Sequence, residues 1–285
     1  MTTEPIFHRK SESESIVDAD IDGLGKPVVL VFTGWNQAEI VGPDWRCACP
    51  KGINTDSIVR MLDAERLLVA DRFGRHSPNA HVISRDGSLV ASFDAGVCIQ
   101  DIVVCGARIV VSYSDQGIFG NDPLSWEGVV VFNHDGSLEF GYKTQFGDEA
   151  VDIADCYALY PDNAQVVWFV PYPRFPLVQL ELPGRRQDVL GMPGPFHESH
   201  AMCATDDAFF FHSNYKEDAS ILAWSRRGGL VEKVGEWKSR LRGILGGRFL
   251  GVTENEVVML TPRLAGAVRL PSGAGMTSTT SRGPL

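Results

Sequence analysis

Apolar and polar residues alternate in short runs along most of this chain, and the segment from Cys98 to Tyr142 shows the pattern most clearly. Runs rich in β-branched residues, separated by turn residues, predict strands over 98–104, 108–113, 128–133 and 137–142. The last two runs meet at Asp135-Gly136, a dipeptide that supplies the positive φ angles of a tight hairpin. The segment therefore predicts a four-stranded antiparallel sheet.

The same unit recurs along the chain. DGSL closes the hairpin of two units, at Asp86 and at Asp135, and glycine-containing turns follow one another at intervals of roughly 37 to 53 residues. Four strands per repeat predict an all-β fold, a six-bladed β-propeller with four-stranded antiparallel blades, over residues 16–271. A miscount of one weak unit would give five or seven blades. The glycines of these turns are Gly34, Gly87, Gly136, Gly184, Gly229 and Gly266.

Both ends of the chain are expected to lie outside the propeller. Residues 1–15 are polar and charged and predict a flexible lead-in, while the small polar residues 272–285 predict a disordered tail. The first unit shows one clear hairpin and weak flanking strands, so the ring is expected to close through residues 16–22 or through a strand from elsewhere. The N-terminus has no apolar secretory region and no run approaches the ~20 apolar residues of a membrane span. A cytoplasmic protein without membrane contact is the expectation.

Charge narrows the classes of partner. The formal net charge is −10, from 36 acidic and 26 basic residues, which argues against nucleic acid and suits a basic protein or a cation. The six cysteines lie mostly in apolar runs and are expected to be reduced. One residue separates Cys47 from Cys49, which is the wrong spacing for a zinc ribbon.

Ionisable residues recur where the innermost strand of each predicted blade begins, at the mouth of the central channel. Converging carboxylates with a histidine would suit a divalent cation, Ca²⁺, Mg²⁺, Mn²⁺ or Zn²⁺, because like charges are costly without a compensating one. Arg242 would compensate them instead, and structural hydrogen bonding at strand starts is the alternative. The candidate metal ligands are Asp56, Asp101, Asp155 and His200.

Loops between strands carry the second set of candidates. The connection from Tyr113 to Glu127 is rich in side-chain oxygens and aromatic residues, and loops on a rigid scaffold often bind ligands. A long turn stabilised by its own side chains is the other interpretation. With the loops of the following blades, it predicts an aromatic rim suited to an interaction surface. The candidate binding residues are Asp115, Asn121, Asp122, Trp126, Tyr172, Arg174 and Tyr215.

Two functions from different classes remain open. The first is a non-catalytic propeller that binds a protein or peptide at this rim and the channel mouth. The second follows from a resemblance in architecture to gluconolactonase- and paraoxonase-like propellers, which implies a metal-dependent hydrolase or lyase acting on a lactone or ester. No G-x-S-x-G or phosphate-loop motif is present, and His197 and His200 are three residues apart, not the four of H-E-x-x-H. Binding is the preferred hypothesis.

Overall fold

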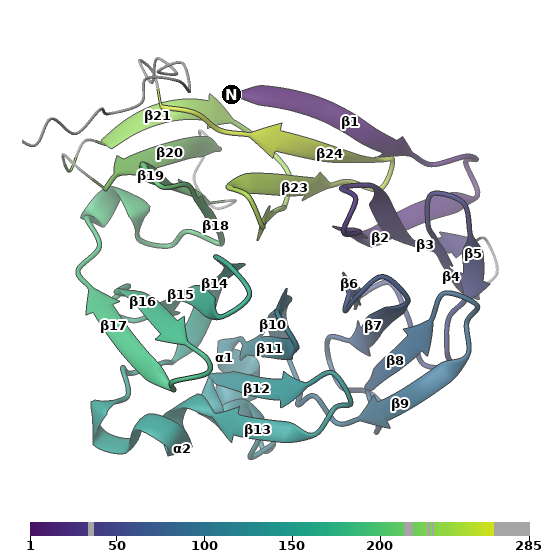
Figure 1. Cartoon of the computed structure of the whole chain (residues 1–285), viewed down its shortest axis with the longest axis horizontal. Coiled ribbons are helices and arrows are strands. Elements are labelled where there is room, and N and C mark those ends of the chain that lie inside the picture. The colour runs from purple at the N-terminus through teal and green to yellow at the C-terminus, as the bar shows by residue number, and fades with distance from the viewer. Residues whose placement is uncertain (34–36, 214–218, 227–228, 230, 265–285) are drawn as a thin grey trace, which may run out of the picture.

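Six four-stranded antiparallel sheets surround a central channel, which confirms the six-bladed β-propeller (Figure 1). The computed structural model describes residues 1–33, 37–213, 219–226, 229 and 231–264. None of the helices within these ranges is long and apolar enough to cross a membrane.

Each blade runs from an inner strand at the channel to an outer strand at the rim. From inner to outer, the first three blades are β2 (Glu14–Ile21), β3 (Pro27–Thr33), β4 (Gln37–Val41) and β5 (Arg46–Ala48); β6 (Ser57–Met61), β7 (Arg66–Asp71), β8 (Ala80–Ser84) and β9 (Leu89–Phe93); and β10 (Ile99–Cys105), β11 (Arg108–Tyr113), β12 (Val129–Asn133) and β13 (Leu138–Gly141). The last three are β14 (Asp155–Pro161), β15 (Val166–Tyr172), β16 (Leu177–Glu181) and β17 (Arg186–Leu190); β18 (Ala201–Ala204), β19 (Ala208–His212), β20 (Ser220–Ser225) and β21 (Val231–Glu236); and β22 (Leu241–Ile244), β23 (Arg248–Val252), β24 (Glu256–Thr261) and β1 (Thr2–His8).

Short helical segments interrupt this pattern mainly in blade 3 and after it. Helix α1 (Asp115–Ile118) and a 3-10 turn (Ser125–Glu127) lie between β11 and β12. Helix α2 (Tyr142–Phe146) and a second 3-10 turn (Gly147–Glu149) connect blade 3 to blade 4, and a third (Gly194–Phe196) precedes blade 5.

The hydrophobic core lies between neighbouring blades. The inner strand β6 is buried on both faces, since all five of its residues are buried. Outer strands such as β9 are largely exposed. Four clusters of buried apolar residues fill the spaces between blades around the ring, and this packing fixes the inner strands that surround the channel.

The N-terminal segment differs from the expected flexible lead-in. Thr2–His8 forms β1, which pairs with β24 from Thr2↔Thr261 to His8↔Glu256 and completes blade 6. The ring therefore closes through a strand from the far end of the chain. The turn predicted at Gly266 and the tail 272–285 lie outside the described residues, and β1 is the strand beside β24.

The first blade also differs from the predicted alignment. Its clear hairpin joins the second and third strands, β3 and β4, whereas the hairpins at Gly87 and Gly136 join the third and fourth. Gly34 itself lies outside the described residues. The interval from Gly34 to Gly87 is therefore the longest of the repeat. It runs from a hairpin of the second and third strands in blade 1 to a hairpin of the third and fourth strands in blade 2.

Candidate functional site

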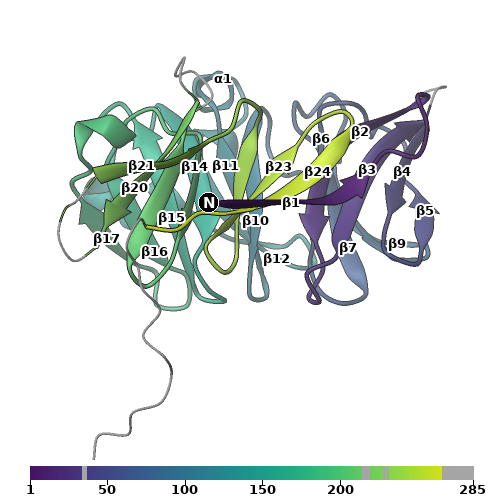
Figure 2. The ribbon, with the colours of Figure 1, turned by 90° about the horizontal axis from the view of Figure 1, so that it is seen from above.

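One mouth of the channel holds a pocket beside α1. Helix α1 projects from this face, and the turns between the first and second strands lie on the opposite face (Figure 2). The pocket, here called the α1-face pocket, has a volume of about 260 Å³. Four consecutive blades, 2 to 5, contribute its lining: Arg72, Phe73, Cys98, Ile99, Gln100, Ser114, Asp115, Gln116, Asp155, Tyr157 and His200.

The connection after β11 forms one wall of this pocket. The backbone N–H and the hydroxyl of Ser114 both donate to the carbonyl oxygen of Cys98, at 3.0 and 3.3 Å. At Gly117 a Cβ would lie 2.5 Å from the carbonyl oxygen of Val97. A residue without a side chain therefore lets α1 pack this closely on the segment before β10. This packing holds Asp115 at the pocket.

Asp155 contributes a second carboxyl group, at the start of β14. Its Oδ1 is buried and has no hydrogen-bond partner among the described residues. Burial, joined by the negative charge of Asp115, raises the pKa of Asp155 to about 6. Two carboxyl groups from neighbouring blades thus face the same small space, and a positive charge there would stabilise both.

Aromatic rings form another wall. Tyr157 stacks on His200 with ring centroids 4.7 Å apart and on Tyr172 at 6.1 Å, and Phe175 meets Tyr157 edge-on at 5.3 Å. Burial, with the charge of His212, lowers the pKa of His200 to about 4. The imidazole of His200 is therefore neutral at pH 7, and this wall presents ring faces without a positive charge.

Arg72 is the cationic residue of the lining. Its Nη1 donates to the backbone oxygens of Ile99 and Gln100, at 2.8 and 2.5 Å, which fixes the guanidinium against β10. Burial, with the like charge of Arg240, lowers the pKa of Arg72 to about 10. Arg72 therefore stays protonated at neutral pH, and its guanidinium donates two hydrogen bonds to backbone carbonyl oxygens.

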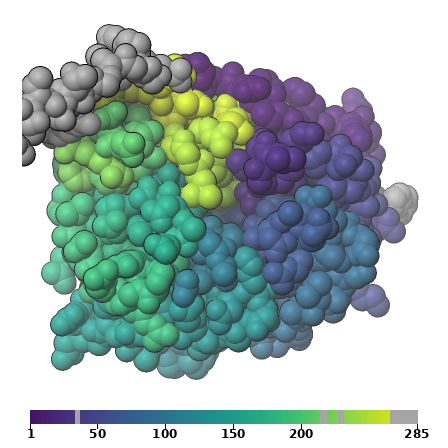
Figure 3. Space-filling view, viewed as in Figure 1, coloured from purple at the N-terminus to yellow at the C-terminus, as the bar shows by residue number. Residues whose placement is uncertain are grey.

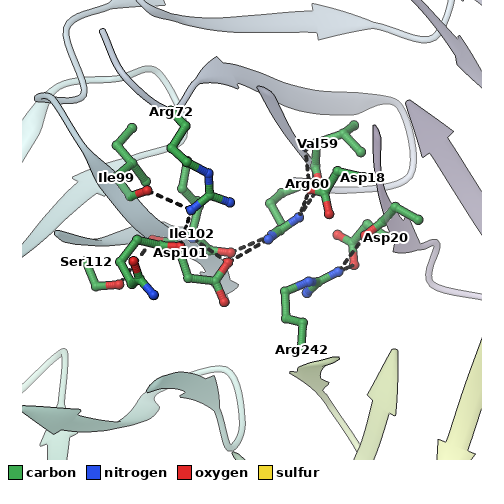
Figure 4. A network of polar contacts seen from close by, with 12 residues as sticks. Asp18, Asp20, Val59, Arg60, Arg72, Ile99, Asp101, Ile102, Ser112 and Arg242 are labelled. Carbon is green, nitrogen blue, oxygen red and sulfur yellow. Dashed lines mark hydrogen bonds and ion pairs between the residues drawn. The ribbon is translucent and has the colours of Figure 1, made fainter. Parts of the chain in front are cut away.

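Deeper in the channel, arginines and carboxylates neutralise one another (Figure 4). Arg60 is 1% exposed, and its guanidinium lies 2.6 Å from both Asp18 and Asp101. Arg242 pairs with Asp20 at 2.8 Å. Burial alone would raise the pKa of Asp18, but the charge of Arg60 holds it below the usual value. These pairs join blades 1, 2, 3 and 6 across the channel.

The four predicted metal ligands are divided between two environments. Asp101 is engaged in the channel network, and Asp56 pairs with Arg75 at 2.7 Å. Asp155 and His200 share the α1-face pocket. In the described ranges, no group of three or more His, Cys, Asp or Glu side chains is arranged to hold a metal ion. The four residues do not surround one point, and a divalent cation here stays a prediction.

The predicted binding residues are also divided. Asp115 lines the pocket and Tyr172 belongs to its aromatic wall. Trp126 is 47% exposed on the connection that carries α1. Asp122 instead accepts hydrogen bonds from the backbone and hydroxyl of Ser125, at 3.1 and 2.6 Å, so it stabilises its own loop.

Asn121 and Arg174 are exposed, and Tyr215 lies outside the described residues. Tyr157 and Arg72 were not predicted as site residues. Tyr157 lies two positions after Asp155 on an inner strand, and alternation along a strand places such residues on one face. That spacing is the signal that could have identified it.

No family model matches the chain, and no curated protein matches it. Among solved structures, a catalytically inactive virginiamycin B lyase from Staphylococcus aureus with quinupristin has a TM-score of 0.51 at 10% identity, covering 91% of this chain and 99% of that chain. PorZ, a surface component of the type-IX secretion system of Porphyromonas gingivalis, has a TM-score of 0.55 at 10% identity; the match covers 91% of this chain and 32% of PorZ. At this identity the likeness establishes the propeller fold alone.

Proposed function

We propose that this protein is a binding propeller that holds a basic protein or peptide on its α1 face, with one cationic side chain of the partner in the α1-face pocket. Asp155 carries this proposal, because its Oδ1 is buried without a hydrogen-bond partner in the described chain. An ammonium or guanidinium group of the partner would supply the missing donor and favour the ionised carboxylate.

The dimensions of the pocket support a single side chain as the occupant. Its volume of about 260 Å³ falls below the roughly 300–1,000 Å³ typical of sites for drug-sized molecules. Tyr157 and Phe73 line the same space, and aromatic faces attract cations such as lysine and arginine. The pocket therefore combines two carboxyl groups, against the single guanidinium of Arg72, with ring faces at the scale of one residue.

The surface around the pocket supports a larger contact. Phe73, Phe119 and Trp126 are exposed on the connections of this face, and Tyr172 is exposed at the end of β15. Aromatic residues are enriched in the energetically important parts of protein interfaces. The net charge of −10 would also increase the rate of encounter with a basic partner.

Selection from a random peptide library displayed on phage tests this proposal. We expect the wild-type protein to enrich peptides that contain lysine or arginine, and Asp155→Asn to lose this enrichment. Asp44→Asn is the matched control, because Asp44 is exposed on a turn of blade 1. Absence of enrichment with the wild type, or equal enrichment with Asp155→Asn, would contradict the proposal.

A hydrolase or lyase acting on a lactone or ester is the second candidate, favoured by one observation. A carboxyl group with a pKa of about 6 is suited to general acid or base catalysis near neutral pH. Turnover of a lactone and ester panel that disappears in Asp155→Asn and follows a single ionisation near pH 6 would favour this candidate. Turnover that persists in Asp155→Asn would exclude that residue as the catalytic group.

A further inference from the structure

A larger cavity opens at the other mouth of the channel. Its volume is about 850 Å³, and it lies among the turns that join the first and second strands of blades 1, 2, 3, 4 and 6. Figures 1 and 3 view this mouth, and the space-filling view shows a hollow at the centre of the face. We call it the hairpin-face cavity. Its volume is within the range of sites that enclose a small molecule.

Apolar side chains form much of the lining. Leu62, Val104 and Ile244 line the cavity from three blades. Two leucines at turn tips are exposed, Leu24 at 83% and Leu245 at 48%. Removing such apolar surface from water is favourable. An apolar ligand would therefore gain from lying here.

Most charges in the cavity are already compensated. Arg60 and Arg242 line it but are paired with carboxylates of the channel network. The carboxylate of Asp20 takes part in that network, and Asp63 pairs with a neighbouring surface arginine at 2.7 Å. Asp22 accepts two backbone N–H groups of its own turn, at 2.9 and 2.8 Å.

Arg248 also lines the cavity, but its charge is not compensated in this way. It pairs with Ile244 across the β22–β23 hairpin, so both side chains lie on one face of blade 6, beside the cavity. Its guanidinium donates to the sulfur of Met259 at 2.9 Å and to the carbonyl oxygen of Leu245 at 3.4 Å. Neither acceptor carries a negative charge, and no carboxylate of the described chain forms an ion pair with Arg248.

Arg85 adds a second uncompensated cation to the lining. Its guanidinium lies 5.7 Å from the ring centroid of Trp45, and its Nε is buried without a hydrogen-bond partner among the described residues. Within the described ranges Arg85 also forms no ion pair with a carboxylate. Arg85 and Arg248 are thus two cations of the lining that form no ion pair with a carboxylate of the described chain.

We propose that the hairpin-face cavity binds a single-chain amphiphilic anion, with its carboxylate or phosphate group at Arg248 and its apolar chain on the surface that includes Leu245 and Leu24. Guanidinium groups bind both kinds of oxyanion through paired hydrogen bonds. The cavity volume of about 850 Å³ leaves room for such a ligand. This site is on the opposite face from the α1-face pocket and does not depend on the function proposed for it.

Isothermal titration calorimetry with decanoate and with decyl phosphate, below their micelle concentrations, tests the proposal. We expect saturable binding of at least one of these anions to the wild-type protein, and the pair distinguishes a carboxylate from a phosphate ligand. Decyltrimethylammonium and decanol have the same chain length without the negative charge, and we expect at least tenfold weaker binding of both. Equal binding of all four would indicate a nonspecific apolar surface and would overturn the proposal.

Two variants locate the site. Arg248→Gln should weaken binding of the anion at least tenfold, and Leu245→Asp should do so by repelling it from an exposed position that tolerates a polar residue. Arg186→Gln is the matched control, on the outer strand of blade 4, where Arg186 pairs with Glu181. Circular dichroism melts confirm that each variant is folded. No binding to the wild type, or unchanged binding in Leu245→Asp, would refute the site.

Discussion

Arg60 and Asp18 form a 2.6 Å ion pair inside the channel, although they come from different blades and lie 42 residues apart in the chain. The carboxylate of Asp18 also accepts the backbone N–H of Val59 at 3.0 Å. On its other side Arg60 pairs with Asp101. One buried guanidinium therefore fixes the relative positions of the inner strands of blades 1, 2 and 3.

Removing this guanidinium should destabilise the protein strongly. In Arg60→Met, Asp18 and Asp101 would stay buried without their cation, which costs about 3–5 kcal/mol. Urea unfolding measures the loss. Arg66→Met is the control, because its pair with Asp63 is about one-third exposed on each side chain and contributes about 0–1 kcal/mol. Equal losses in the two variants would contradict the role of Arg60.

Asp155 should make stability depend on pH. Its pKa is about 6 in the folded protein and 3.8 as the reference value, so between these values the folded state binds more protons than the unfolded state. The contribution of Asp155 to stability should therefore fall as pH rises from about 4 to 6. Relative to the wild type, Asp155→Asn should gain on the order of 1 kcal/mol at pH 7, after allowance for solvent screening, and little at pH 4. Urea unfolding at the two pH values measures this gain.

The same substitution should have opposite effects on stability and binding. Residues retained for binding are often unfavourable for the free protein. If Asp155→Asn is no more stable than the wild type at pH 7, burial of the ionised Asp155 carboxylate does not destabilise the folded protein. That outcome would contradict the prediction. Asp44→Asn, which removes an exposed carboxylate, should leave the pH dependence unchanged.

Gly117 does not line the α1-face pocket, but Gly117→Ala should change the position of the wall that α1 forms. The new Cβ would lie 2.5 Å from the carbonyl oxygen of Val97, so α1 and Asp115 would have to move. We expect a loss of about 1–3 kcal/mol in stability and weaker binding of basic peptides. Gly191→Ala is the control, because a Cβ there meets nothing within 4 Å. Thermal melts and peptide titrations of both variants test the prediction, and indistinguishable behaviour would contradict it.

Deleting residues 1–9 should open blade 6. The deletion removes the backbone hydrogen bonds between β1 and β24, each worth about 0.5–1.5 kcal/mol net, and leaves β24 as an unpaired edge. We expect a lower unfolding midpoint and concentration-dependent association, because exposed edges pair with other chains. Size-exclusion chromatography and thermal melts measure both. A truncated protein as stable and monomeric as the full chain would show that β1 is dispensable.

The local parts of the fold were predictable from sequence because their signals are local. Gly87 and Gly136 have φ angles of 86° and 84° in the DGSL turns, the conformation that this sequence favours. The pairing of β1 with β24 was not predictable, because Thr2 and Thr261 are neighbours only once the ring has closed. No local pattern marks a strand whose partner lies at the far end of the chain.

The site was predictable only in part, for a related reason. Asp155 and His200 were identified because they begin inner strands, a position that repeats in every blade. Arg60 lies within an apolar run that is typical of a core strand, so its pairing with Asp101 could not be inferred. Which charges meet across the channel depends on side-chain direction and on contacts between blades, and the sequence period reports neither.

The pairing of β1 with β24 has a consequence for biosynthesis. Blades 1 to 5 consist of consecutive strands and can assemble as the chain leaves the ribosome, N-terminal blades first. Blade 6 needs Thr2–His8 together with Glu256–Thr261. β1 is synthesised before blades 1 to 5 and must therefore stay unpaired until β24 has been made. Until blade 6 forms, the apolar face of blade 1 that packs against it stays uncovered, and chaperone protection would matter most in that interval.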